Sequence, residues 1–417
     1  MMKDLKMETI DYQKEYQLKN MEINALLELS NAINDNIKES QLVLAYQFTL
    51  MGSAGVGRLA LFIVEETNAR TMNCKAQFNT AQNYTQAPLP EAFLDITKIT
   101  KKEDFGPNVD ESFQEFDVLI PVSHKDQRLA MLFVAQKEVG RVNDMNLQFI
   151  QAITNLVAVA IENKKFARQQ MKQELMSREL EIAHQVQKSL LPTKLPQGDK
   201  FHVAAEYVPH HGIGGDYYDY ISLDDHRFLI CMADVSGKGV PAALVMSNFQ
   251  ASLRTIILHT TDLKEAVAAV NHQIYSRNGQ DKFITVFLAI YDQREQQLNY
   301  VNAGHNQPML IREDGRLELL DQGSTVIGIM DPLPFISEGV VKNLTEFTLF
   351  CYTDGLTETF NTAEDDFGEE RTEECLRRNF RKKPDEINQI MMDALNDFRG
   401  EVPFADDISL LTIKKWD

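Results

Sequence analysis

The sequence lacks the features of a disulfide-rich or membrane-spanning protein. Its four cysteines are scattered and form no CxxC pair, which favours reduced, mostly buried thiols: Cys74, Cys231, Cys351 and Cys375. No apolar run approaches the roughly 18 residues that a membrane span needs, and the first residues contain no apolar segment typical of a signal peptide. We therefore expect a cytoplasmic protein.

Basic residues are also fewer than acidic residues. The chain has 42 basic and 61 acidic residues, which gives a formal net charge of −19. This balance argues against nucleic acid or an anionic membrane as the main partner. It is compatible with metal binding without demonstrating it.

The length of 417 residues exceeds one ordinary core, so two or three domains are expected. After an N-terminal tail over 1–20, apolar spacing predicts a helix over 21–51 that the polar stretch NDN interrupts. A strand over 57–66 and a hairpin over 116–138 follow, and a cap at Asn143 opens a long closing helix. These elements predict one α+β domain.

This order of elements, over residues 21–164, resembles that of a GAF domain, a small-molecule or redox sensing module. The likeness rests on the pattern of elements, because the NKxxF-type signature of cyclic-nucleotide-binding GAF domains has no equivalent here. A bound ligand and a role in dimerisation alone both stay open, and no ligand is assigned.

Residues 165–195 are expected to form a helical linker. Four apolar residues fit the 4-3-7 spacing of a short coiled-coil seam: Met176, Leu180, Ala183 and Leu190. Gln187 interrupts this seam with a polar side chain, and further apolar residues widen the stripe. The helix can therefore pair with a second copy, pack on its own domain, or do both in different halves.

Residues 196–417 are strand-rich with inserted helices, and two antiparallel sheets covered by helices would explain their order. The expected strands lie at 201–207, 217–223, 228–235, 284–291, 298–303, 309–312, 345–352 and 408–413. The expected helices begin after Pro241 and span 263–278 and 384–398.

The strands at 217–223 and 228–235 form a hairpin about Asp225. Residues equidistant from Asp225 then face each other, so Asp216 and Asp234 would meet at the open end. Like charges directly across a strand pair are destabilising. Two facing aspartates therefore need an explanation, and a function at this end of the hairpin would supply one.

Acidic residues recur at the ends of predicted strands. Asp216 opens a strand, Asp234 and Asp354 close two others, and Asp406 and Asp407 open the last. Strand ends aim side chains from a rigid sheet into one cleft, and flanking glycines let backbone and ligand approach closely. Carboxylates gathered there repel one another unless a cation neutralises them, and Mg²⁺ and Mn²⁺ prefer such oxygen ligands. The pattern predicts a metal site.

Five motifs contain or accompany these acids: GGDYYDY, ADVSGKGVPAAL, NAGHNQP, YTDGLTE and FADDISLLTI. Their order and approximate spacing resemble SpoIIE-like phosphatases, the bacterial branch of the type 2C metal-dependent serine/threonine phosphatases. The likeness covers about residues 175–417, including the helix RELEIAHQVQKSLLP that leads into the domain. It implies a two-metal centre in a sandwich of two β-sheets flanked by helices.

The resemblance also implies a role for each acid. By motif position, Asp234 resembles the acid that bridges both metals, and the Val235 carbonyl resembles a backbone ligand beside it. Asp216 resembles a ligand of one metal, whereas Asp354 and Asp406 resemble ligands of the other. Asp407 is a lesser candidate, because the wider family often has asparagine at its position.

Three further residues are lesser candidates. Asp219 lies three residues from Asp216 and so on the opposite face of the strand. Lys238 in SGKG would place a cation near the incoming phosphate, although the flanking glycines more simply permit a tight turn. His305 in NAGHNQP would serve as a general acid, although a histidine in such a segment more often orients a loop.

The chemistry implied by the resemblance is in-line attack on phosphorus by a water that two metal ions activate. The wider family often has histidine soon after the bridging aspartate, but here Val235 and Ser236 follow Asp234. A serine hydroxyl is a poor acid at neutral pH. We therefore expect metal-bound water to protonate the leaving group and assign no general acid.

The sequence thus predicts a Mn²⁺- or Mg²⁺-dependent phosphoserine/phosphothreonine protein phosphatase regulated by a GAF-like domain. The resemblance implies that its substrate is a phosphorylated anti-sigma-factor antagonist, a STAS-domain protein, in a partner-switching pathway. A homodimer paired through the linker helix is expected. Two alternatives stay open: an inactive scaffold of the same fold, which the complete set of aspartates disfavours, and a metal hydrolase of a small phosphoester.

Overall fold

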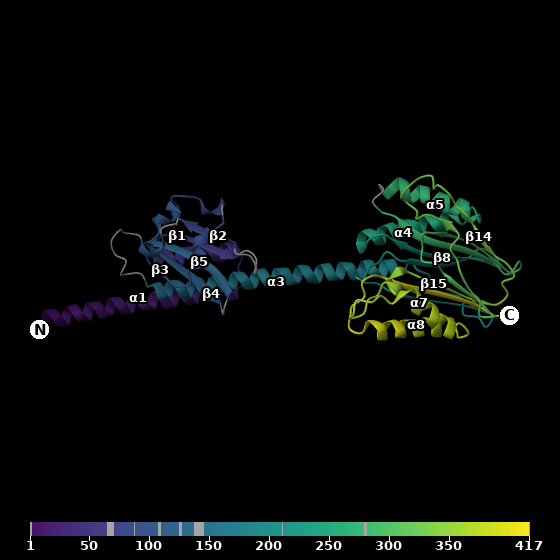
Figure 1. Ribbon diagram of the computed structural model, residues 1–417. Helices are drawn as coiled ribbons and strands as arrows, with labels where there is room; N and C mark the ends of the chain where they lie inside the picture. Colours follow the sequence, from purple (N-terminus) through teal and green to yellow (C-terminus); the bar gives the residue numbers. More distant parts are fainter. Residues whose placement is uncertain are drawn as a thin grey trace. The chain divides into compact units, whose positions relative to one another are not determined.

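The computed structural model describes residues 2–64, 71–86, 88–106, 110–124, 127–136, 146–210, 212–278 and 282–416. The chain forms two compact units, Met1–Glu174 and Leu175–Asp417, which have different folds (Figure 1). In the part of the chain that is described, no helix combines the length and the apolar character needed to cross a membrane.

The first unit is built on a five-stranded antiparallel sheet with the order β2-β1-β5-β4-β3. Its main elements are α1 (Met2–Asn34), α2 (Glu39–Ser53), β1 (Val56–Val64), β2 (Met72–Phe78), β3 (Thr100–Lys101), β4 (Val118–His124), β5 (Gln127–Gln136) and α3 (Leu147–Lys188). The predicted order of helix, strand, hairpin and closing helix is present, and the stretch NDN separates α1 from α2. Residues 2–20, expected as a tail, belong to α1, and the predicted cap at Asn143 lies outside the described residues.

Apolar side chains cover both faces of this sheet, as the alternation of a strand requires. On one face Leu59 of β1 packs in a cluster with Tyr46 of α2 and Val157 of α3. On the other face lies an aromatic cluster that includes Phe62, Phe93, Phe113 and Phe133. The unit is an α+β domain, and its likeness to a GAF domain stays a prediction.

The helix α3 changes along its length from a buried to an exposed apolar helix. Its first turns bury Ile150 and Ile153 in the core of the first unit. Farther along, six large apolar side chains are exposed: Phe166, Met171, Leu175, Met176, Ile182 and Val186. Exposed apolar residues on one helix can contribute to an interaction site, and pairing of this helix stays a prediction.

The second unit is a sandwich of two β-sheets with helices on both outer faces (Figure 1). One sheet has the order β13-β10-β9-β8-β7, with β14 also paired to β10, and the other has the order β12-β11-β15-β16-β6. The ladders are antiparallel apart from that between β10 and β13. The elements are β6 (Phe201–Val208), β7 (Tyr217–Ser222), β8 (Arg227–Val235), α4 (Val240–Ile256), α5 (Leu263–Asn278), β9 (Ile284–Asp292), β10 (Gln297–Ala303), β11 (Met309–Arg312), β12 (Leu317–Leu319), β13 (Gly323–Ser324), β14 (Gly339–Val341), β15 (Phe347–Tyr352), α6 (Asp354–Thr357), α7 (Gly368–Asn379), α8 (Pro384–Arg399) and β16 (Ile408–Lys415).

Three apolar layers hold this sandwich together. Between the sheets, Phe228 and Tyr291 pack with Phe347 and Leu411. Outside one sheet α4 and α5 form a second cluster, and outside the other α7 and α8 form a third. The strands and helices predicted for this region are all present within two residues of their expected ends. The elements that were not predicted are short or strongly polar: β12, β13, β14, α6 and α7.

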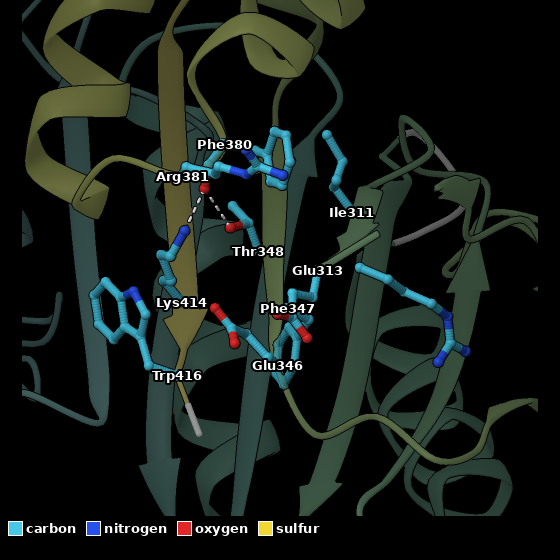
Figure 2. A pocket seen from close by; sticks show the side chains of 10 residues that line it. Ile311, Glu313, Glu346, Phe347, Thr348, Phe380, Arg381, Lys414 and Trp416 are labelled. Carbon is cyan, nitrogen blue, oxygen red and sulfur yellow. Dashed lines mark hydrogen bonds between the residues drawn. The ribbon is translucent and has the colours of Figure 1, made fainter. Parts of the chain in front are cut away.

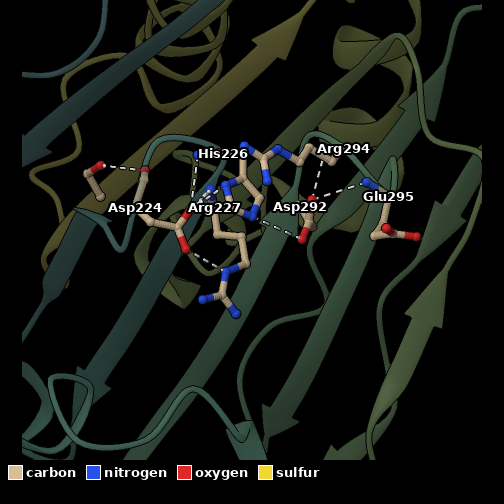
Figure 3. Close-up of polar contacts among 7 residues, drawn as sticks. Asp224, His226, Arg227, Asp292, Arg294 and Glu295 are labelled. Atoms are coloured by element: carbon tan, nitrogen blue, oxygen red, sulfur yellow. Dashed lines mark hydrogen bonds and ion pairs between the residues drawn. The ribbon is translucent and has the colours of Figure 1, made fainter.

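The β7–β8 hairpin has the predicted register, with Tyr217 opposite Ala233. Hydrogen bonds close its turn (Figure 3). Asp224 accepts the backbone N–H groups of His226 at 3.0 Å and Arg227 at 2.8 Å, and the Arg227 Nε donates to it at 2.8 Å. These interactions, led by the N–H of His226, lower the pKa of Asp224 to about 2 although partial burial opposes them. The acid at this end of the hairpin is therefore fully partnered as a carboxylate.

Candidate metal centre

Asp216 and Asp234 lie at the other, open end of the hairpin, directly beyond the paired residues Tyr217 and Ala233. The Asp216 side chain is almost completely buried, at 2 % exposure. Burial, followed by the negative charge of Asp234, raises the pKa of Asp216 well above its usual range. The two acids predicted to face each other are thus close enough to interact strongly.

Two hydroxyl groups from the second sheet fix the Asp216 carboxylate. Thr353, which follows β15, donates to Asp216 Oδ2 at 2.8 Å, and Ser409 of β16 donates to the same oxygen at 2.7 Å. The backbone N–H of Ser409 in turn donates to the Thr353 hydroxyl at 2.9 Å. Asp216 therefore belongs to one sheet and is oriented by the other.

Asp354 and Asp406 bring two more carboxylates from that second sheet. Asp354 begins α6 directly after β15, and Asp406 lies just before β16. Burial, and then the charges of Asp354 and Asp406, raise the pKa of Asp234 to about 7. Burial, and then Glu358 and Asp406, raise the pKa of Asp354 to about 6. Asp354 follows Thr353, which donates to Asp216, and Asp406 adjoins Asp407, which accepts the N–H of Gly215. These contacts bring the strand ends that bear the four predicted acids to one edge of the sandwich.

The Asp407 carboxylate is hydrogen-bonded to the backbone of the loop that precedes β7. One carboxylate oxygen accepts the N–H of His210 at 2.8 Å, and the other accepts the N–H of Gly215 at 2.7 Å. Its own N–H donates to Asp406 Oδ1 at 2.9 Å. Asp407 therefore holds the loop that carries Asp216, a role that its sequence position did not predict.

Lys238 brings a positive charge to the edge of the cluster. Its Nζ lies 2.8 Å from Asp406 Oδ2 and also donates to the Ala405 carbonyl. The neighbouring Gly237 and Gly239 have φ angles of 89° and 71°, a backbone conformation that glycine adopts readily. One lysine beside four acids leaves a large excess of negative charge.

The two remaining lesser candidates have other partners. Asp219 is fully buried and accepts two hydrogen bonds of 2.8 Å from Arg254 of α4, on the face of β7 opposite Asp216. His305 Nδ1 lies 2.9 Å from the Thr285 hydroxyl. Burial lowers the pKa of His305 to about 4, so its imidazole is neutral at pH 7 and a poor general acid. Asp219 is thus explained as the buried partner of Arg254, whereas the contact of His305 with Thr285 involves only one of its ring nitrogens.

Glycines allow the backbone to approach these acids closely. A Cβ on Gly355 would lie 2.0 Å from the Asp407 carbonyl oxygen, and one on Gly215 would lie 2.8 Å from the Val235 carbonyl oxygen. Side chains at either position would displace the strand ends that carry the acids. The Val235 carbonyl, the predicted backbone ligand, therefore lies directly against the loop that leads to Asp216.

This donor set fits a hard divalent cation. The donors are oxygens, and their burial and mutual repulsion are what a bound cation relieves. Among the described residues, no group of three or more His, Cys, Asp or Glu side chains is arranged so that it could hold a metal ion as it stands. Mg²⁺ usually keeps several waters and is held by one or two carboxylates, so an open acidic edge suits it.

A separate pocket of about 270 Å³ lies at the opposite ends of β15 and β16 (Figure 2). There Thr348 pairs with Lys414 across the ladder. The Phe380 carbonyl, just after α7, accepts the Thr348 hydroxyl at 2.8 Å and the Lys414 Nζ. These polar groups stabilise the end of a helix, where a cation is favourable, and the pocket is not part of the acidic site.

Thr353 and Ser409 support the site but were not singled out from the sequence. Thr353 directly precedes Asp354, and Ser409 lies two residues after Asp407, on the same face of its strand. Hydroxyl residues that share a strand end with the acids were therefore an available signal.

Known proteins resemble this chain in sequence and in fold. Residues 224–416 match the family described as Stage II sporulation protein E (SpoIIE). Protein IcfG of Synechocystis sp. is 26% identical over 305 residues, which cover 67% of this chain and 46% of that protein. Phosphoserine phosphatase RsbU of Bacillus subtilis is 33% identical over 160 residues, which cover 38% of this chain and 47% of that protein.

The chain thus spans about half the length of the curated relatives it matches. Among solved structures, the SiaA-PP2C domain of Pseudomonas aeruginosa aligns with a TM-score of 0.53 at 24% identity, over 59% of this chain and 99% of that domain. This likeness shows that the second unit has the same fold.

Proposed function

We propose that the chain is a Mn²⁺- or Mg²⁺-dependent protein serine/threonine phosphatase of the SpoIIE-like type 2C class. The match of residues 224–416 to the SpoIIE family supports this proposal. The observation that carries this proposal is that the loops and strand ends bearing Asp216, Asp234, Asp354 and Asp406 meet at one edge of the two sheets. The similarity to RsbU, whose name specifies phosphoserine, supports a phosphoserine or phosphothreonine substrate.

In this proposal Asp216, Asp234, Asp354, Asp406 and the Val235 carbonyl would hold the metals. When bound, the ions would supply an activated water and neutralise charge on the phosphoryl oxygens. The chain's own residues prepare the site: hydroxyl groups orient the buried Asp216 from the opposite sheet, and Asp234, Asp354 and Asp406 stay partly open to solvent.

Two side chains near the site are poor proton donors. His305 is neutral at pH 7 because burial lowers its pKa to about 4. The Ser236 hydroxyl accepts the N–H of Phe283 at 2.9 Å and so fixes the loop after β8. Neither is assigned as a general acid. Lys238 is placed to offer positive charge to an incoming phosphate if its pairing with Asp406 is exchanged.

The substrate and the regulation follow from the same proposal. The substrate is a phosphorylated STAS-domain anti-sigma-factor antagonist of a cytoplasmic partner-switching pathway. The first unit acts as a GAF-like regulator, and the exposed apolar stripe of α3 supports a homodimer paired through this helix.

The proposal is tested with the purified chain, Mn²⁺ and three substrates: a phosphoserine peptide, p-nitrophenyl phosphate and a nucleotide. Asp234→Asn and Asp354→Asn should fold and lose phosphatase activity. Retained activity in either variant would contradict the site. Absence of any turnover would favour a scaffold, and turnover of the nucleotide alone would favour a small-phosphoester hydrolase. Incubation with phosphorylated STAS proteins of the same cell then identifies the substrate.

A further inference from the structure

The last turn of α3 contacts the loop that carries Asp216. Gln187 is only 4% exposed. Its Nε2 donates to the Gly214 carbonyl at 2.6 Å, and its Oε1 accepts the N–H of Gly214 at 3.2 Å. One buried side chain thus satisfies both backbone groups of one residue. Because buried polar groups need such partners, the contact ties Gly214 to the helix.

Gly214 is also packed closely against Asp407 and Tyr207. A Cβ on Gly214 would lie 2.0 Å from Asp407 Oδ2 and 2.4 Å from the Tyr207 hydroxyl. The next backbone N–H, that of Gly215, donates to Asp407 Oδ2 at 2.7 Å, and Asp216 follows directly. A change at Gln187 is therefore expected to shift the backbone of Gly214 and Gly215. This backbone orients Asp216 and is hydrogen-bonded to Asp407.

Gln187 lies where α3 passes from exposed to buried surroundings. Val186 and Ile182 are 59% and 62% exposed, whereas Leu191 is buried in the cluster formed with α4 and α5. Gln187 is also the polar residue that interrupts the predicted coiled-coil seam. An amide at position 187 can hydrogen-bond to Gly214, which a leucine at this position of the seam could not do.

We propose that Gln187 is a positioning residue of the metal centre. Through Gly214 and Gly215 it holds Asp216 and Asp407 in the arrangement that binds a divalent metal, so that the end of α3 sets the metal affinity of the phosphatase domain. The inference rests on the proposed function, because it requires that Asp216 is a metal ligand. Gln187 acts through backbone and touches neither metal nor substrate.

The test replaces Gln187 by methionine in the full chain. Gln187→Met keeps the length of the side chain and removes both hydrogen bonds. We expect an unchanged circular dichroism spectrum and a Mn²⁺ dissociation constant, measured by calorimetry, that rises by about 10-fold, as when a partner that orients a metal ligand is lost. Gln185→Met is the matched control, because Gln185 is exposed on the same turn of α3, and it should bind Mn²⁺ like the wild type.

Two further readouts separate positioning from damage to the fold. Hydrogen exchange of the backbone around Gly214 should accelerate in Gln187→Met and not in Gln185→Met. Activity of Gln187→Met should approach that of the wild type at saturating Mn²⁺. If Gln187→Met folds poorly, Gln187→Asn keeps the amide but withdraws it by one carbon, and it should weaken Mn²⁺ binding in the same direction.

The outcomes that overturn the inference differ from those that overturn the function. Equal Mn²⁺ affinity in Gln187→Met and the wild type, or an activity loss that excess Mn²⁺ does not restore, would overturn the role of Gln187 and leave the proposed function standing. A wild-type chain that binds no Mn²⁺ would overturn both.

Discussion

The β7–β8 hairpin has acids at both ends, but the pKa of the acid is lowered at the turn and raised at the open end. At the turn, Asp224 accepts N–H groups from His226 and Arg227, and its pKa falls to about 2 (Figure 3). At the open end, burial and other acids raise the pKa of Asp234 to about 7 and that of Asp216 well above its usual range. The turn supplies donors, whereas the open end gathers further carboxylates.

Burial alone does not explain this difference. Asp219 lies within the same strand and is fully buried, yet Arg254 binds both of its carboxylate oxygens. The open end is distinguished by four neighbouring acids, of which Asp406 alone is paired with a cation, Lys238, among the described residues. Unbalanced charge of this kind is characteristic of functional sites, and here it is the feature that calls for a metal.

The largest expected effect is on catalysis at the open end. Asp216→Asn should lower the Mn²⁺-dependent hydrolysis of a phosphoserine peptide by more than about 100-fold, because loss of a ligand exceeds the loss of a residue that merely supports one. Asp224→Asn, the same change at the turn, should leave the rate near that of the wild type. Comparable losses in both variants would show that the two ends do not differ in function.

The next largest effect concerns Asp219 of β7, whose charge is balanced by Arg254. Arg254→Met leaves Asp219 buried without its cation and should destabilise the second unit by about 3 kcal/mol in urea unfolding. Arg227→Met removes a partly exposed partner of Asp224 at the turn and should lower the free energy of unfolding much less. Equal destabilisation would contradict the view that Arg254 balances the charge of the buried Asp219 carboxylate.

A smaller effect of opposite sign is expected when the metal is removed. The raised pKa of Asp234 means that its ionised form is disfavoured in the folded protein, and at pH 8 it is largely ionised. With EDTA at pH 8, Asp234→Asn should therefore raise the free energy of unfolding by roughly 2 kcal/mol. Mn²⁺ should then stabilise the wild type and not this variant. A metal-free variant that is less stable than the wild type would argue against repulsion at the open end.

Much of this architecture could be predicted because its signals are local. Alternating strands about a short polar turn predicted the hairpin register, and acids at strand ends predicted the convergence of Asp216 with Asp354. The partners of those acids could not be predicted in the same way. Thr353 and Ser409 reach Asp216 because β15 pairs with β16, and Gln187 meets Gly214 only because the chain folds back on α3. α7 was missed because its sequence is mostly charged, with few buried residues.

The most direct test of the central claim locates the metal on the hairpin itself. Paramagnetic Mn²⁺ broadens nearby amide resonances, and the six residues of β7 separate its two ends by about 20 Å. Titration of Mn²⁺ should broaden the amides of Asp216 and Asp234 and spare that of Asp224, and Asp234→Asn should abolish the broadening. Broadening at the turn instead, or equally at both ends, would contradict a metal centre at the open end.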